Sequence, residues 1–333
     1  MGLVRLPHPK RERVLVPVVP SPAMSLPEHL RALGAEVSNW GRWGDDDELG
    51  TLNLIDGVAV QRGIAAARTG ERIPLAIRLD ANGPQLGTIP GRINPLHTMV
   101  AINTAYTGDS GDFCCSDDVL TLGLQAGTHW DALAHVSYDG LLYNGHPAAS
   151  ITAERGATRC GIHRVTSIVS RAILLDVAHA LGLDRLAPRH LITEADLEAS
   201  VALAGVRPEP GDIVLVRTGQ MSYLKAKDRQ QYTLGDQPGL TVGTVPWLRR
   251  HDVAAVATDT LALEVFPCED PAVLFPVHLL QIRDMGLMQG QNFDLEALSA
   301  HCAADGTYEM LLVANPEPVT GGTGAPTSPV AIK

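Results

Sequence analysis

The chain carries the stretch QAGTHWDALAH at residues 125–135. From Val119 to Asp131, apolar and polar residues alternate, which predicts one extended strand with an apolar face toward the core and a polar face opposite. Side chains two positions apart in a strand project to the same side, about 7 Å apart along it. We therefore expect His129 and Asp131 to reach one cation together, with Gln125 in the same row.

The residues after Asp131 predict a helical turn, because Ala132–Ala134 are good helix formers. Such a turn would bring His135 back to the side of Asp131. An imidazole there could take a proton from water and return it to a leaving group, since its pKa lies near neutral pH. The spacing alone leaves two interpretations open: a metal site, or buried residues that only satisfy each other's hydrogen bonds.

The same stretch resembles the signature of the cyclase family, which includes bacterial kynurenine formamidases and isatin hydrolases and reads His-x-Gly-Thr-His-x-Asp-x-Pro-x-His. The chain has the signature's Gly127, Thr128, His129, Asp131 and His135, with Gln125 in place of the first histidine and Leu133 in place of the proline. The resemblance implies that His129 and Asp131 bind a catalytic divalent ion and that His135 is the acid/base. An amide oxygen from Gln125 would be a harder and weaker ligand than imidazole, which favours manganese over zinc.

Further blocks resemble the longer branch of this family over roughly residues 38–329. By this resemblance Gln291 completes the metal site, and a neutral residue there implies one divalent ion, with Mn²⁺ favoured and Zn²⁺ possible. His278 lies in an apolar run, where it is either a buried hydrogen-bonded residue or a contact to the substrate or the ligands. Trp43 and Trp130 are either core residues or an aromatic wall for a planar substrate.

Composition excludes several functions. The 333 residues carry a formal net charge of −11 and no stripe of Lys or Arg, so we expect no nucleic-acid partner. No apolar run has the length of a signal peptide or a membrane span, which predicts a cytoplasmic protein with no membrane partner. The five cysteines form no CxxC pair, which argues against a disulfide framework and a thiolate zinc site. We expect a small-molecule substrate.

Local patterns predict a mixed α/β protein. Buried strands are expected at Ser170–Val177, Asp212–Arg217, Val253–Thr258 and Met310–Ala314, and helices at Thr193–Ala204, Thr244–His251 and Asp294–Ala304. We expect residues 1–23 to form a flexible N-terminal arm and residues 24–333 to form a single catalytic domain. The Gly- and Pro-rich segment 316–333 is either a flexible tail or a segment that wraps a neighbouring subunit or approaches a ligand.

The family resemblance implies the rest of the expectation. The fold would be the swivelling β/β/α cyclase-type α/β fold, a mixed barrel-like sheet surrounded by helices, in a homodimer or homotetramer. The activity would be hydrolysis of an amide, lactam or lactone bond of a small carbonyl substrate, with aromatic substrates included, by metal-activated water. Two alternatives stay open: a cyclase or dehydratase that uses the same ion as a lyase, and a metal- or ligand-binding protein without turnover.

Overall fold

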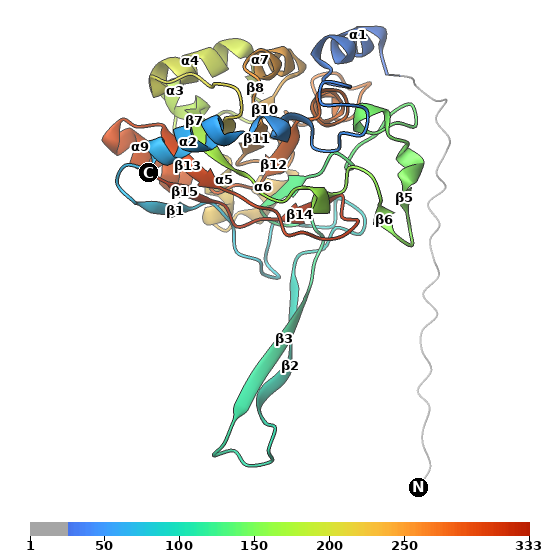
Figure 1. Ribbon diagram of the computed structural model, residues 1–333. Helices are drawn as coiled ribbons and strands as arrows, with labels where there is room; N and C mark the ends of the chain where they lie inside the picture. Colours follow the sequence, from blue (N-terminus) through green and yellow to red (C-terminus); the bar gives the residue numbers. More distant parts are fainter. Residues whose placement is uncertain (1–25) are drawn as a thin grey trace.

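A computed structural model describes residues 26–333 of the chain (Figure 1). The N-terminal arm expected over residues 1–23 therefore lies outside the described residues. Within them, no helix has both the length and the apolar character needed to cross a membrane.

A curled, mixed nine-stranded sheet organises the protein. Its strands lie in the order β1 (Arg72–Pro74), β15 (Val330–Ile332), β13 (Glu309–Val313), β7 (Val169–Asp176), β9 (Ile213–Arg217), β11 (Ala255–Thr258), β12 (Met288–Gln291), β4 (His129–Asp131) and β14 (Gly324–Pro326). The strands β7, β9, β11 and β12 run parallel, and every other pair is antiparallel. The mixed α/β fold expected from the sequence is confirmed.

The four strands expected from apolar runs are confirmed as β7, β9, β11 and β13, with ends that shift by one or two residues. Every residue of β9 and β11 is buried, as is β7 after its first residue. Continuous apolar runs are typical of strands covered on both faces. Strand β13, the third from one edge of the sheet, instead alternates between buried and half-buried residues.

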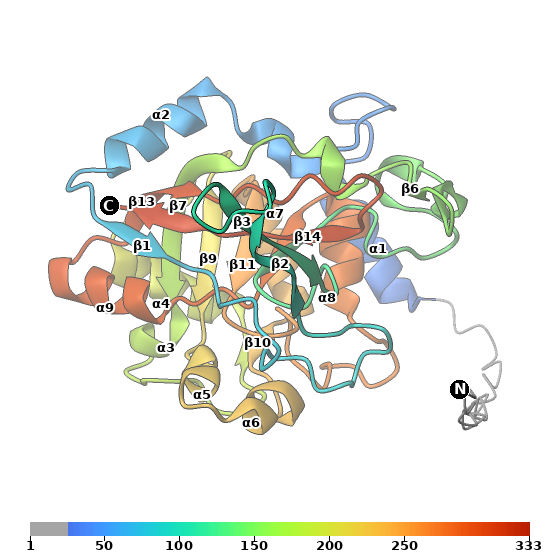
Figure 2. The same cartoon turned by 90° about the horizontal axis from the view of Figure 1, so that it is seen from below.

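Nine α-helices surround this sheet in the described part of the chain: α1 (Glu28–Val37), α2 (Gly57–Ala66), α3 (Val177–Ala180), α4 (Glu194–Ala204), α5 (Met221–Lys225), α6 (Arg229–Leu234), α7 (Val245–Arg250), α8 (Pro276–His278) and α9 (Glu296–Asp305). Figure 2 shows α2 on one side of the sheet and α3 and α4 on the other. The three helices expected from the sequence are α4, α7 and α9. A capping box between Thr193 and Asp196 starts α4, and Gly205 ends it with φ 66°.

A two-stranded ribbon, which we call the β2–β3 arm, projects far from the body of the protein (Figure 1). It pairs β2 (Leu96–Ala105) with β3 (Cys114–Thr121) in antiparallel fashion. The single strand expected from Val119 to Asp131 is therefore wrong. The chain leaves β3 at Thr121, turns where the Ala126 amide donates to the Gly123 carbonyl (2.9 Å), and resumes pairing only at His129.

The C-terminal segment 316–333 is part of the sheet, so the interpretation of a flexible tail is wrong. It supplies β14, which pairs with β4, and β15, which pairs with β1 and β13. Gly324 lies opposite Asp131, where an added Cβ would come within 2.8 Å of the Trp130 carbonyl oxygen. Only glycine allows this close approach.

Smaller elements complete the described part of the chain. Two short ribbons pair β5 (Ile151–Thr152) with β6 (Gly156–Ala157) and β8 (Leu191–Ile192) with β10 (Gly239–Leu240). Helix α8 continues into a π-helical turn, η6 (Leu279–Met285). Because β12 follows this turn, the end of α8 lies near the strand that pairs with β4.

Candidate metal-binding active site

Strand β4 holds two polar side chains side by side between its neighbours β12 and β14. His129 and Asp131 are two residues apart, so they project to the same side of the sheet. The Nε2 atom of His129 lies 3.5 Å from Oδ1 of Asp131. Gln291 pairs with His129 across the ladder, and its side-chain amide donates to Oδ2 of Asp131 at 2.9 Å. The sheet register thus brings these three side chains together.

His135 joins this group through a tight turn. Its backbone amide donates to the Ala132 carbonyl at 2.9 Å, and no helix follows. The expected helical turn is therefore wrong, but the turn still places Nε2 of His135 3.6 Å from Oδ1 of Asp131. Burial lowers the pKa of His135, and the charge of Asp131 opposes this. The ring is therefore poised to accept a proton in its neutral form.

His278 reaches the same place from the end of α8. Its Nδ1 lies 2.5 Å from Oε1 of Glu264, and the Glu264 carboxylate also accepts from the backbone amides of Val277 and His278. Glu264 is buried, so this contact fixes the orientation of the ring. His278 is thus both a buried hydrogen-bonded histidine and a side chain that lines the cavity, and its Nε2 makes no hydrogen bond within residues 26–333.

A cavity of about 620 Å³ opens in front of these side chains. His129, Asp131, His135, His278 and Gln291 line one part of it. Much of the remaining wall is apolar and comes from Ile89, Pro90, Val136, Leu234, Phe266 and Leu274. An apolar cavity of this size with a few convergent polar groups is typical of a site for a small organic molecule.

The donor set fits a divalent cation because two of its acceptors have no partner. Oδ1 of Asp131 and Oε1 of Gln291 are buried and accept no hydrogen bond from residues 26–333, an arrangement that is costly unless a cation or solvent satisfies them. Nδ1 of His129 lies 2.8 Å from the Gly127 carbonyl oxygen, which leaves Nε2 as the free nitrogen, as in metal-bound histidines.

The charge of this group also suits a cation. Burial by itself raises the pKa of Asp131, but the neighbouring His135 and His129 outweigh burial and hold that pKa below its usual range. Asp131 is therefore an anion. Among residues 26–333, no three His, Cys, Asp or Glu side chains form a group with metal-site spacing. The case for a metal thus depends on the unsatisfied oxygens, one of which belongs to an amide.

The structure does not bring Gln125 to this group. Its side-chain amide lies 3.3 Å from the Thr323 hydroxyl, and it is not among the residues that line the cavity. The turn between Gly123 and Ala126 breaks the alternation that put Gln125 in one row with His129. The amide faces β14 instead, beside Gly324.

The two tryptophans do not form a wall of the cavity. Trp130 is fully buried, donates its indole N–H to the Ala314 carbonyl at 2.8 Å and packs edge-on against Phe293. It lies between His129 and Asp131 in β4, so it points to the other face of the sheet. Trp43 stacks on the Arg42 guanidinium. The aromatic rings at the cavity are Phe266 and Phe275, stacked with centroids 5.5 Å apart.

Sequence reasoning missed several residues of the cavity. Arg92 and Phe266 lie in loops without periodicity, so no pattern in the sequence singles them out. Glu264, which holds His278, is separated from it by 14 residues. The one available signal for Glu264 was an acidic residue inside the apolar run Leu261–Phe266, since a buried carboxylate requires partners.

The comparisons with known proteins agree on one family. A family model described as Cyclase, putative cyclase, matches residues 64–265. A crystal structure of a novel cyclase is 36% identical, with a TM-score of 0.82 over 90% of this chain and 99% of that chain. Among the curated proteins, none matches the chain.

Isatin hydrolases share the fold at lower identity. Isatin hydrolase A from Ralstonia solanacearum is 20% identical, with a TM-score of 0.55 over 82% of this chain and 95% of that chain. An isatin hydrolase bound to the product analogue thioisatinate is also 20% identical, with a TM-score of 0.56 over 83% of this chain and 98% of that chain.

Proposed function

Because the chain belongs to the cyclase family, we propose that it is a metal-dependent hydrolase that cleaves an amide, lactam or lactone bond of a small carbonyl substrate. The observation that carries this proposal is the unpaired Oδ1 of Asp131, which lies between two imidazole nitrogens beside an apolar cavity. The isatin hydrolases, whose name describes hydrolysis of a lactam, share the fold and support the reaction class.

One divalent ion would be held by His129, Asp131 and Gln291. When bound, it would supply Lewis acidity, which polarises a carbonyl group and makes water a better nucleophile. Two oxygen donors beside one imidazole favour manganese, with zinc as the second possibility. A second ion has little anionic support, because the Glu264 carboxylate already serves His278 and two backbone amides.

His135 would carry the proton in this reaction. Its Nε2 faces Asp131 at 3.6 Å, and burial favours its neutral form. It would take the proton of the attacking water and deliver it to the leaving nitrogen or oxygen, which otherwise departs as a strong base. His278, whose ring is oriented by Glu264, would contact the substrate from the end of α8.

The proposal is tested by metal content and turnover of the same preparation. Protein purified without chelator is analysed for metals, then assayed with isatin, dihydrocoumarin and formanilide in ¹⁸O-labelled water. We expect close to one manganese or zinc per chain and one labelled oxygen in the carboxylate product. Water loss with ring closure would indicate a lyase instead. Absence of both metal and turnover would contradict the proposal.

We also propose that the chain works as a homodimer or homotetramer through the β2–β3 arm, with no macromolecular partner of another kind. The arm exposes eight large apolar side chains: Leu96, Met99, Val100, Ile102, Tyr106, Phe113, Val119 and Leu120. A two-stranded ribbon is marginal by itself, and exposed apolar surface of this kind marks an interface. Its strands have free edges, so two copies can pair around a two-fold axis.

The oligomer is tested by a matched pair of surface variants. Ile102→Ser on the arm and Val58→Ser on α2 remove side chains of similar exposure, 68% and 64%. Analytical ultracentrifugation should show a weaker oligomer for Ile102→Ser alone. An arm shortened by replacing residues 99–118 with a Gly-Ser turn should be monomeric. Unchanged assembly of the shortened protein would refute the role of the arm.

A further inference from the structure

Among residues 26–333, one arginine lines the cavity. Arg92 lies in the loop between β1 and β2, which also supplies Thr88, Ile89 and Pro90 to the cavity wall. The Arg92 backbone amide donates to the Ile89 carbonyl at 3.1 Å, so the loop is turned on itself at this point. The turn sets a long cationic side chain into a largely apolar cavity.

The Arg92 guanidinium has no partner in the part of the chain that the structure describes. Every other arginine there that is at least half-buried donates to a carboxylate, a carbonyl or a hydroxyl group. Arg171 and Arg217, for example, each bind two or more carboxylates. Arg92 forms neither an ion pair within 4.0 Å nor a side-chain hydrogen bond.

Burial lowers the pKa of Arg92, and the charge of Asp131 opposes this effect only in part. The guanidinium nevertheless stays protonated, because its ordinary pKa lies far above neutral pH. Asp131 is too distant for an ion pair with Arg92, and it would be occupied by the divalent ion. The half-buried guanidinium therefore faces the cavity without a partner among the described residues, so that an anionic group of a ligand can bind it.

We propose that Arg92 binds a carboxylate group of the substrate, so that the enzyme acts on small anionic amides, lactams or lactones. This inference rests on the proposed function, since it places the scissile bond beside His135. Guanidinium matches a carboxylate with two parallel hydrogen bonds. The chain carries a net charge of −11, so an anionic substrate needs a local cation to enter. Arg92 lies close enough to Asp131 and His135 for their charges to act on one another, so the carboxylate and the scissile bond would be near neighbours in the substrate, and the apolar wall would hold its hydrocarbon or aromatic part.

The test compares a charged probe with its neutral counterpart. Phenylacetate and phenylacetamide have the same shape, and only the first can form an ion pair with Arg92. Binding of each is measured by isothermal titration calorimetry on protein loaded with Mn²⁺. The variants are Arg92→Gln, Arg92→Lys and, as a matched control, Arg78→Gln, which removes an exposed arginine outside the cavity. Elemental analysis confirms equal metal content in all four proteins.

We expect the wild type to bind phenylacetate more tightly than phenylacetamide. Arg92→Gln should weaken phenylacetate binding about 10- to 100-fold, the usual range for loss of hydrogen bonds to a charged group, and leave phenylacetamide unchanged. Arg92→Lys should recover part of the loss, and Arg78→Gln should have no effect.

Two results would overturn the inference: equal binding of phenylacetate by wild type and Arg92→Gln, or no preference of the wild type for phenylacetate. Either could occur while the protein still hydrolyses neutral amides, in which case the proposed function stands and only the role of Arg92 fails. Conversely, a wild-type protein that prefers phenylacetate through Arg92 but hydrolyses no amide, lactam or lactone would contradict the proposed function and leave the role of Arg92 standing.

Discussion

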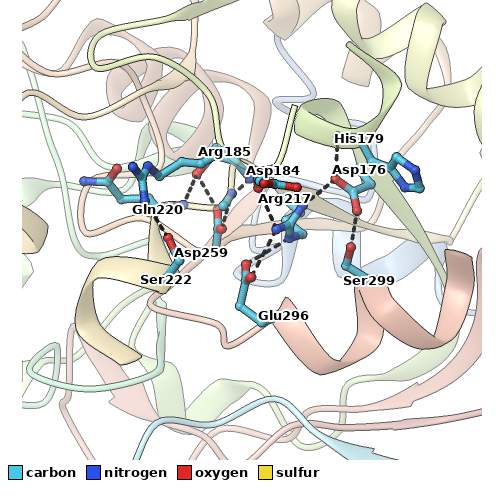
Figure 3. A network of polar contacts seen from close by, with 12 residues as sticks. Asp176, His179, Asp184, Arg185, Arg217, Gln220, Ser222, Asp259, Glu296 and Ser299 are labelled. Atoms are coloured by element: carbon cyan, nitrogen blue, oxygen red, sulfur yellow. Dashed lines mark hydrogen bonds and ion pairs between the residues drawn. The ribbon is translucent and has the colours of Figure 1, made fainter. Parts of the chain in front are cut away.

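Two buried polar clusters of this protein differ in how their carboxylates are satisfied. Around Arg217, at the carboxyl ends of β7 and β9, every oxygen of the Asp176, Glu296 and Asp259 carboxylates has a donor (Figure 3). Arg217 donates to Asp176 at 2.9 Å and to both oxygens of Glu296 at 2.9 and 3.1 Å, and Ser299 donates to the second oxygen of Asp176. Both oxygens of Asp259 accept from the backbone of the loop after β9.

The cavity cluster on β4 and β12 is incomplete by the same criterion. Asp131 and Gln291 each keep one buried oxygen without a donor, and the nearby Arg92 has no anion. Paired buried charges stabilise a fold only when each partner is present, whereas unpaired ones indicate a missing ligand. The difference therefore assigns the Arg217 cluster to structure and the Asp131 cluster to binding, and four predictions test that assignment.

The largest effect is expected for His135→Ala. If His135 moves the proton, its loss should lower kcat about 10²- to 10⁴-fold. The metal content and the melting temperature should not change, because His135 is not one of the proposed ligands and forms no structural hydrogen bond through its ring in the described part of the chain. Steady-state assays give kcat, elemental analysis gives the metal content, and thermal denaturation gives the melting temperature. The exposed His301→Ala serves as control, and loss of the metal from His135→Ala would contradict the role.

The Arg217 cluster should respond in stability and not in metal binding. Arg217→Met leaves the buried Asp176 without its ion-pair partner and Glu296 without two donors, which should cost about 3–5 kcal/mol of unfolding free energy. Urea denaturation measures this loss. The exposed pair Arg250–Glu194 is the matched control, because Arg250→Met should cost less than about 1 kcal/mol. Folded Arg217→Met protein that fails to bind Mn²⁺ would contradict the assignment of the Arg217 cluster to structure alone.

Asp131→Asn should act mainly on metal binding. The variant keeps an oxygen that can accept from Gln291 and removes only the charge. Mn²⁺ affinity should fall about 100-fold or more, because loss of a residue that merely hydrogen-bonds to a metal ligand already costs about 10- to 100-fold. The unfolding free energy of the metal-free protein should also fall at neutral pH, because the lowered pKa of Asp131 means that the folded state favours its charged form. Calorimetric Mn²⁺ titration and denaturation in chelator provide both measurements. A destabilised variant with normal Mn²⁺ affinity would mark Asp131 as structural.

Local sequence patterns predicted those parts of the fold whose environment is uniform. The runs that form β7, β9 and β11 are mostly apolar because both faces are covered, and a capping box marks the start of α4. The alternation from Val119 to Asp131 misled because its apolar residues belong partly to the β2–β3 arm, where Val119 and Leu120 are exposed. A pattern of apolar residues does not tell whether their face packs against the rest of the same chain or stays exposed on it.

The candidate site divides in the same way. His129, Asp131 and His135 could be grouped from spacing because they lie within seven residues of one strand and turn. Gln291 required the family resemblance, since only the pairing of β12 with β4 brings it to Asp131. Arg92 could not be predicted, because the position of its loop depends on tertiary contacts that no local pattern encodes.

The smallest effect concerns pH and Asp259, within the Arg217 cluster. Burial raises the pKa of Asp259 to about 6, against the hydrogen bonds from Thr218. The unfolded chain has the ordinary value near 4, so the folded state holds the proton more tightly. The stabilising contribution of this proton is thus full below pH ~4 and is lost as the pH rises through ~6. The unfolding free energy of the wild type, measured relative to Asp259→Asn, should therefore fall by at most ~3 kcal/mol across that window.

Urea denaturation of both proteins at pH 4, 5, 6 and 7 isolates this contribution, because all other carboxylates are common to the pair. Asp45→Asn, which replaces an exposed carboxylate, controls for the change in net charge. A difference that rises with pH would mean that the attraction of Arg217 outweighs burial at Asp259. Since Arg217 also binds Asp176 and Glu296, its charge would then be shared among three carboxylates, and the cluster would be stabilised most where all three are ionised.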